Sequence, residues 1–153
     1  MVVSEICTRD VVTCSRGTGV RELAQLMREG HVGDVVVVER RNGGAVPLGI
    51  VTDRDLVVRV LAKGLDIDAV TAGDLMGEPL TTVFGSEGID DAIWHMRGHG
   101  IRRLPVVDSH GFLLGVVTMD DIAARLATDL ADMVRIVASQ DQRERRALAP
   151  RAA

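Results

Sequence analysis

Two copies of a Gly-x-x-Thr-x-x-Asp segment hold the residues of this chain that are best placed for chemistry. Thr52 and Asp55 stand three positions apart in the first copy, and Thr118 and Asp121 repeat them 66 positions later. Each pair follows a β-branched run and precedes an apolar helical pattern, which is the spacing of a helix N-cap and an acidic N3 residue. Capping alone stabilises a helix by about 1 kcal/mol. The glycine that opens each segment permits a tight backbone turn.

The duplication of the segment favours a second role for its threonine and aspartate. The amino end of a helix presents free N–H groups and a partial positive charge, which attract phosphate. A carboxylate beside it can accept hydrogen bonds from two ribose hydroxyls. Two such segments in related halves of one chain therefore predict two ribose-phosphate sites facing a shared cleft.

The elements that position these residues also occur twice. Upstream of the segments the halves match at an offset of 69 positions, and apolar residues at i, i+3, i+4 and i+7 predict an amphipathic helix in each half. These residues are Val20, Leu23, Ala24 and Met27 in the first half, and Ile89, Ala92, Ile93 and Met96 in the second. β-branched or apolar runs over residues 35–38, 46–51, 104–107 and 112–117 predict strand pairs, and residues 11–13 and 80–83 each predict a short first strand.

The predicted fold class is α+β: two pseudo-symmetric β-α-β-β-α repeats packed sheet to sheet, followed by a C-terminal helix. A repeat of about 55 residues exposes a sheet face that it cannot bury alone, so each repeat needs the other. The predicted divisions are repeat 1 over residues 1–64, a linker and the start of repeat 2 over 65–77, repeat 2 over 78–127, and a C-terminal helix and flexible tail over 128–153. We expect that helix to reach about Ser139, with a frayed tail over residues 140–153.

Composition excludes several classes of function. The net charge of −4, the pI near 5.5 and an aromatic content of 2% argue against nucleic-acid binding. No apolar run is long enough to span a membrane and no signal peptide is visible, so we expect a cytoplasmic protein without membrane contact. Cys7 and Cys14 are expected to be buried free thiols, a disulfide or a metal site shared with a histidine being the alternative.

Other residue types give weaker signals. His95 and His99 have the i, i+4 spacing of metal ligands, but no third ligand accompanies them, and surface histidines are the expected interpretation. Trp94 lies beside the apolar stripe of its helix and is expected either at a dimer contact or against the C-terminal helix. No nucleophile with a paired base and no phosphate loop is present, so an enzyme is not expected.

Three features together resemble a tandem pair of CBS domains, the Bateman module. They are the doubled Gly-h-h-Thr-x-x-Asp segment (h, apolar), the Arg-Arg-Leu-Pro-Val-Val-Asp run over residues 102–108, and Asp74-Leu75-Met76. The resemblance covers about residues 3–127. It implies a regulatory module that binds an adenosyl ligand (AMP, ADP, ATP, NAD(H) or S-adenosylmethionine) between its repeats, with no metal. It also implies a homodimer shaped as a flat disc.

The resemblance further implies roles for individual residues. Asp55 and Asp121 would bind ribose hydroxyls, and Thr52 and Thr118 would contact ribose or phosphate. Arg102 and Arg103 would reach phosphate, with a further contact from Arg54. The residues that would frame the adenine are Val12, Thr13, Cys14, Thr82 and Val83.

The two halves differ in charge at one matched position. Gly33 and Asp34 stand where the second half has Arg102 and Arg103, and Asp34 would repel a phosphate that Arg103 attracts. We therefore expect two clefts of unequal use, while the sequence leaves open which cleft the arginines serve. The expected function is a stand-alone regulatory protein that acts in trans on a protein partner; the alternative is a structural or stress-response dimer without a physiological ligand.

Overall fold

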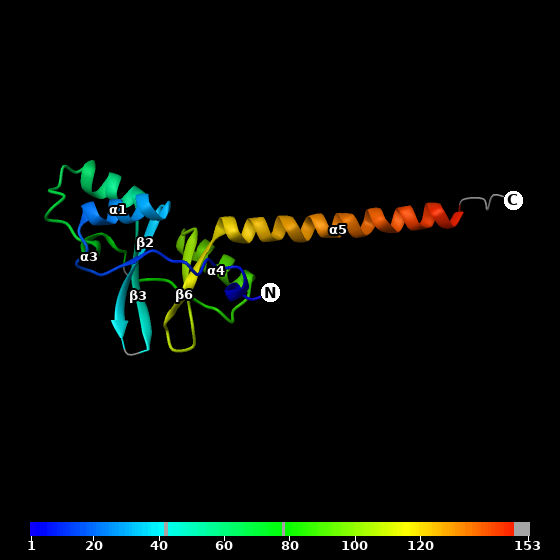
Figure 1. Cartoon of the computed structure of the whole chain (residues 1–153), viewed down its shortest axis with the longest axis horizontal. Helices are drawn as coiled ribbons and strands as arrows, with labels where there is room; N and C mark the ends of the chain where they lie inside the picture. The colour runs from blue at the N-terminus through cyan, green and yellow to red at the C-terminus, as the bar shows by residue number, and fades with distance from the viewer. Residues whose placement is uncertain (42, 78, 149–153) are drawn as a thin grey trace.

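The computed structural model describes residues 1–41, 43–77 and 79–148. Its elements fall into two matching series, and Figure 1 shows them as neighbouring bodies with one long helix extending away. The first series is η1 (Val3–Glu5), β1 (Thr13–Cys14), α1 (Val20–Gly30), β2 (Asp34–Arg41), β3 (Gly44–Thr52), α2 (Asp53–Asp55) and the π-helical segment η2 (Leu56–Leu61). The second series is α3 (Ala72–Leu75), β4 (Val83–Phe84), α4 (Ile89–His99), β5 (Arg103–Val107), β6 (Leu113–Thr118) and α5 (Met119–Leu148).

The strands form two three-stranded sheets of identical topology. Their orders are β1-β2-β3 and β4-β5-β6, and in each sheet the first pair is parallel and the second antiparallel. Both antiparallel pairs shift register at the same place, between Val37 and Val38 and between Val106 and Val107. The repeated sequence thus produces the same backbone twice, including the register shift in the antiparallel strand pair. The predicted α+β class with two β-α-β-β-α repeats is confirmed.

Helices α1 and α4 cover one face of each sheet. The predicted apolar stripes supply their buried side chains, which are Val20, Leu23 and Met27 in α1 and Ala92 and Met96 in α4. Ala24, predicted on the same stripe, is exposed. Each helix ends in a left-handed residue, His31 or Gly100, which turns the chain back into the next strand.

The opposite faces of the two sheets pack against each other. Val36 and Val38 of β2 and Val116 of β6 form a buried cluster there, with Ile50 and Leu113 packed against it. Two further clusters lie between each sheet and its own helices. Each repeat therefore has one core of its own and shares a third with the other, as expected for repeats too small to bury both sheet faces.

The segment that opens each repeat packs on the other repeat. Val3 is fully buried in the cluster that holds Val83 and Met96. Ala72, Leu75 and Met76 lie in the cluster of α1 and β2. Isolated β-bridges fix both crossings, one between Val2 and Gly88 and one between Gly19 and Thr71. The predicted boundaries between repeat 1, the linker and repeat 2, at residues 64 and 77, remain predictions. In the folded chain the two repeats exchange their opening segments.

The glycines of the duplicated segment have a different purpose from the tight turn expected of them. Gly49 and Gly115 lie within β3 and β6, and neither has a positive φ. A Cβ on Gly115 would lie 2.6 Å from the Thr8 carbonyl oxygen, and one on Gly49 would lie 2.6 Å from the Met76 Cβ. Both glycines therefore allow the exchanged segment to pass close to the strand.

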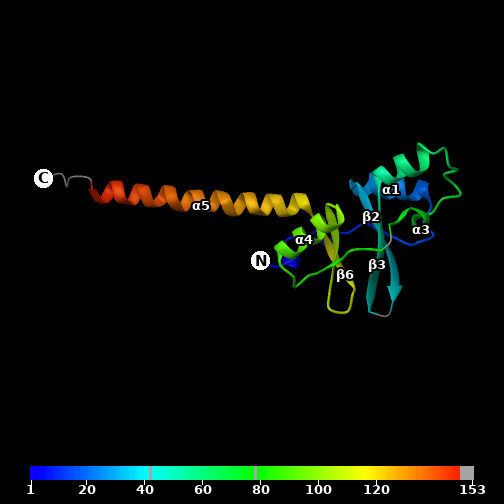
Figure 2. The same cartoon turned by 180° about the vertical axis from the view of Figure 1, so that it is seen from behind.

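Helix α5 is longer than predicted. The apolar pattern suggested an end near Ser139, whereas the helix continues through Leu148; the predicted tail beyond it, residues 149–153, lies outside the described residues. Figures 1 and 2 show α5 leaving the body, and Trp94 remains 62% exposed rather than lying beneath it. Within the described residues, no helix combines the length and apolar character needed to cross a membrane.

Gly115→Ala should destabilise the fold by about 1–3 kcal/mol, because the new methyl group meets a backbone carbonyl that is itself hydrogen-bonded to Val116. Urea unfolding followed by circular dichroism measures this change. Gly98→Ala is the control: Gly98 lies in α4 with open space around it, and alanine there should leave stability unchanged or slightly raised. Equal stability of the two variants would contradict the close-approach explanation.

Candidate functional site

A cavity of about 690 Å³ lies between the two repeats. Three stretches of chain line it: the junction of β3 with α2 and η2, the connection that precedes β4, and the turn from α4 into β5. The described lining residues are Ile50, Thr52, Asp53, Arg54, Asp55, Arg59, Gly77, Pro79, Leu80, Thr81, His99, Gly100, Ile101, Arg102 and Arg103. The first stretch belongs to one repeat and the last to the other, so a molecule in this cavity would contact both.

Thr52 and Asp55 form a closed capping box at the edge of the cavity. The backbone N–H of Thr52 donates to Asp55 Oδ2 at 2.9 Å, and the Thr52 hydroxyl donates to the same oxygen at 2.7 Å. The Asp55 N–H lies 3.2 Å from Thr52 Oγ1. One carboxylate oxygen thus maintains the helix start, while Oδ1 lies 3.8 Å from the Arg59 guanidinium.

The same box occurs at two other helix starts. Asp121 accepts from Thr118 at 2.8 and 2.7 Å, and Asp74 accepts from Thr71 at 2.9 and 2.7 Å. These bonds hold the pKa of the exposed Asp74 carboxyl below its usual range. Neither Thr71 nor Asp74 lines the cavity. The capping box is therefore a structural device of this chain, and further groups are needed to make a binding site from it.

Those further groups are arginines. Arg54, Arg59, Arg102 and Arg103 all line the cavity, against the two carboxylates of Asp53 and Asp55. Arg59 also donates to the carbonyl oxygens of Leu75 and, at 3.2 Å, Asp74. Four arginine residues lining one concave surface suit an anion with several oxygen atoms, because guanidinium binds phosphate through paired hydrogen bonds.

Arg103 is also ion-paired, and its partner is Asp34 of the other repeat. The Asp34 side chain is only 19% exposed. Burial raises the pKa of this carboxyl, the Arg103 guanidinium lowers it, and Asp53 raises it further. Since Asp34 and Arg103 are matched positions of the two repeats, the pair joins the repeats at their pseudo-symmetric centre. The sequence predicted that Asp34 would repel a bound phosphate and that Arg103 would attract one. In the structure the two side chains form an ion pair with each other.

The predicted site residues divide into three groups. Thr52, Arg54, Asp55, Arg102 and Arg103 line the cavity together. Thr118 and Asp121 form the matching box at the junction of β6 and α5. The predicted adenine-framing residues Val12, Thr13, Cys14, Thr82 and Val83 do not line this cavity, where Pro79, Leu80 and Thr81 stand instead.

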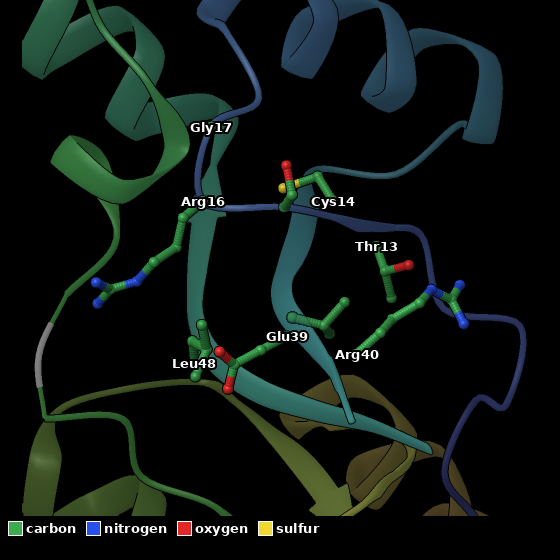
Figure 3. A pocket seen from close by; sticks show the side chains of 9 residues that line it. Thr13, Cys14, Arg16, Gly17, Glu39, Arg40 and Leu48 are labelled. Atoms are coloured by element: carbon green, nitrogen blue, oxygen red, sulfur yellow. The ribbon is translucent and has the colours of Figure 1, made fainter. Parts of the chain in front are cut away.

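The framing residues lie elsewhere for identifiable reasons. Val83 is buried in the second core, and Val12 packs on the first core while its carbonyl accepts from the Val36 N–H at 3.0 Å. Thr82, which is half-buried, directly precedes β4. Thr13 and Cys14 form β1 and line a separate, open cavity of about 540 Å³ (Figure 3).

The second cavity offers little convergent chemistry. In Figure 3 the side chains of Arg16 and Arg40 extend to opposite sides, so their guanidinium groups do not converge on one ligand.

The cysteines and histidines do not form a metal site. Cys14 is buried, Cys7 is half-buried, and both are free thiols whose pKa is raised by burial. His99 lines the first cavity and its Nδ1 lies 2.9 Å from the His95 carbonyl oxygen. Within the described residues, no three histidine, cysteine or acidic side chains are grouped as metal ligands.

Comparison with known proteins assigns the family. The sequence matches the CBS domain family twice, over residues 3–62 and over residues 72–128. The chain belongs to the CBS-domain family. Its two repeats are a CBS pair, and the cavity lies between them.

Three proteins illustrate the similarity. The chain is 43% identical over 120 residues to MK0525 of Methanopyrus kandleri, covering 78% of this chain but only 60% of that protein. It is 37% identical over 106 residues to Hypoxic response protein 1 of Mycobacterium tuberculosis, covering 67% of this chain and 69% of the relative. The CBS domain protein PAE2072 from Pyrobaculum aerophilum, solved in complex with AMP, superposes with a TM-score of 0.71 at 31% identity over 84% of this chain and 99% of that one.

The CBS pair resolves a point that the sequence left open. Arg102 and Arg103 of the second repeat line the same cavity as Thr52 and Asp55 of the first repeat, whereas Thr118 and Asp121 of their own repeat do not line it. The Met119 N–H donates to the Arg102 carbonyl at 2.8 Å, so the arginine turn is tied to the start of α5. The matching bond of the first repeat joins the Asp53 N–H to the Gly33 carbonyl at 3.0 Å.

Sequence reasoning missed several lining residues of this CBS cleft. Arg59 follows Asp55 by four positions on one helix face, a spacing that already indicated contact between the two side chains. Leu80 and Thr81, which line the cavity, directly precede the predicted Thr82, and the framing role of Thr82 stays a prediction. His99 and Ile101 lie in the same turn as Arg102 and line the cleft with it. No sequence pattern marked them as site residues.

Asp34→Asn should strengthen binding of inorganic triphosphate to the cleft by about tenfold. The substitution removes a negative charge that is paired with Arg103, and one such charge at about 10 Å contributes about 1–2 kcal/mol at a surface site. Isothermal titration calorimetry measures the affinity. Asp68→Asn is the control, since exposed Asp68 pairs with Arg21 outside the cavity and should leave the affinity unchanged. Weaker binding by Asp34→Asn would mean that Asp34 orients Arg103 for the anion.

Proposed function

We propose that this CBS pair is a regulatory module that binds an adenine nucleotide in the cleft between its repeats. The observation that carries the proposal is one cavity that unites the Thr52–Asp55 box of the first repeat with Arg102 and Arg103 of the second. Such a ligand would contact both repeats at once. Its binding would therefore depend on how the repeats are arranged.

Each part of a nucleotide has a matching group in the cleft. Asp55 Oδ1, which the capping box leaves unused, can accept from a ribose hydroxyl, and Thr52 lies beside it. Arg54, Arg102 and Arg103 can donate to phosphate oxygens. Ile50, Leu80 and Ile101 supply an apolar wall for the adenine, with Thr81 beside it.

The charge of the cleft favours ligands with several phosphate groups. Four arginines attract the phosphates of ADP, ATP or NAD(H) more strongly than the single phosphate of AMP, and they disfavour the cationic sulfonium of S-adenosylmethionine. The AMP complex of PAE2072 supports the adenosyl class. The matching site at Thr118 and Asp121 has Asp120 in place of Arg54 and Asp34 in place of Arg103, so we expect it to bind the same ligands more weakly.

The proposed output is a change in arrangement that a protein partner reads. A ligand shifts the equilibrium between two arrangements only as far as its affinity differs between them. The bond from Met119 to Arg102 offers a direct route from the phosphate-binding turn to α5. We further propose that the protein acts in trans as a homodimer, in the cytoplasm and without catalysis of its own.

One observation favours a second candidate function. That observation is the ion pair in which Asp34 neutralises Arg103 beside the cleft. The chain is also similar to Hypoxic response protein 1, a protein named for a stress response. A structural or stress-response dimer whose cleft binds no physiological ligand is the alternative. Ligand binding separates the two candidates.

AMP, ADP, ATP, NAD(H) and S-adenosylmethionine should be compared by thermal shift. A ligand at 100 times its dissociation constant stabilises the fold by about 2.7 kcal/mol, which raises Tm by several degrees. We expect ATP or ADP to give the largest rise. Absence of a shift with all five ligands would contradict the nucleotide proposal and favour the structural alternative.

Asp55→Ala and Asp74→Ala separate ligand contact from capping. Both substitutions remove the carboxylate of a Thr-x-x-Asp box, but only Asp55 lines the cleft. We expect Asp55→Ala to abolish the nucleotide-induced shift and Asp74→Ala to retain it, whatever each does to the basal Tm. Loss of the shift in both variants would show that the boxes act through stability alone.

A further inference from the structure

Helix α5 carries an exposed apolar surface that the rest of the chain does not cover. Ile122, near its start, is almost fully buried against the second CBS repeat. The apolar side chains farther along are 46% to 68% exposed: Leu126, Leu130, Met133, Val134, Ile136 and Val137. Figures 1 and 2 show the helix continuing straight away from the body, so the protein's own fold does not bury them.

Five of these residues form one continuous band, the α5 stripe: Leu126, Leu130, Met133, Val134 and Val137. The spacings of four, three and four residues from Leu126 through Leu130 and Met133 to Val137 place them on one side of a helix. Alternate steps of three and four are also the pattern of a helix that pairs with another helix. Ile136 lies about a third of a turn away from the stripe, although it is equally exposed.

The charges of α5 differ between its two halves. Residues 119–134 contain four aspartates and one arginine, whereas residues 135–148 contain four arginines, one aspartate and one glutamate. The first half is therefore net acidic and the second net basic. A partner helix that complements both halves must present basic residues beside the first and acidic residues beside the second.

We propose that the α5 stripe is covered by the α5 helix of a second copy of this chain, running antiparallel. In that orientation each acidic half lies beside a basic half, and the two stripes overlap about their common centre near residues 131 and 132. A parallel pair would instead place each residue near its own copy, acidic half beside acidic half. It would also bring Glu144, which continues the face of the stripe, against its counterpart.

This arrangement sets the two CBS bodies at opposite ends of the helix pair. The stripe lies outside the cleft between the repeats, and none of its residues lines that cavity. The proposal concerns how two chains associate and goes beyond the proposed ligand binding.

Mass measurement by sedimentation velocity on the full chain tests the surface. Leu130→Asp and Val137→Asp should each halve the mass of the assembly, because they place a charge in the stripe. Ile136→Asp is the matched control, with the same change one residue from Val137 and with similar exposure, and should keep the wild-type mass. A monomeric wild type, an unchanged mass in the stripe variants, or an equal loss in the control would each overturn the proposal.

Disulfide cross-linking tests the orientation. Ala123 and Asp141 lie on the same side of the stripe, about equally far from its centre, so they meet across chains only if the helices are antiparallel. The double variant Ala123→Cys, Asp141→Cys should cross-link on mild oxidation while each single variant does not. The wild type, with Cys7 and Cys14 alone, gives the background. Cross-linking of a single variant above that background would indicate a parallel pair and overturn the antiparallel arrangement.

Discussion

Burial of the shared sheet face is the constraint on which the rest of the structure depends. Each three-stranded sheet is covered by helices on one side only, and its second side carries β-branched residues such as Val36 and Val116 that must leave water. The repeats meet this need by packing face to face, while the opening segments that they exchange pack into the two helix-covered clusters. The cleft follows from that packing, because the ends of the two sheets carry the Thr52–Asp55 box and the Arg102–Arg103 turn to the same place.

The relation between stability and binding is clearest in the repeated capping box. Three helix starts use the same threonine and aspartate, and at one of them, Thr71–Asp74, the box lies outside the cleft. The residues that give the cleft its character are the arginines: Arg54 in α2, Arg59 about one turn farther along η2, and Arg102 and Arg103 of the other repeat. A site of this kind can change its ligand through the arginine positions without losing a helix cap.

Much of the fold could be predicted from the sequence, because the strands and helices depend on local periodicity that occurs twice. The stripe at Val20, Leu23 and Met27 and the β-branched runs required no knowledge of the partner repeat. The exchange of opening segments could not be predicted in this way, since the burial of Val3 depends on residues about eighty positions away. The same limit explains why the sequence did not show that Thr13, Cys14 and Val83 lie outside the cavity that holds Arg102, or that Asp34 and Arg103 form an ion pair.

The way in which α5 is attached allows a small movement at its base to become a large movement at its far end. Its first N–H is bonded to the carbonyl of Arg102, while its thirty residues extend about 45 Å from that point. A rotation of about 5° at the base would displace the far end by about 4 Å over that length. The helix is therefore a lever, in which an adjustment too small to disturb the core becomes a displacement that another molecule can detect.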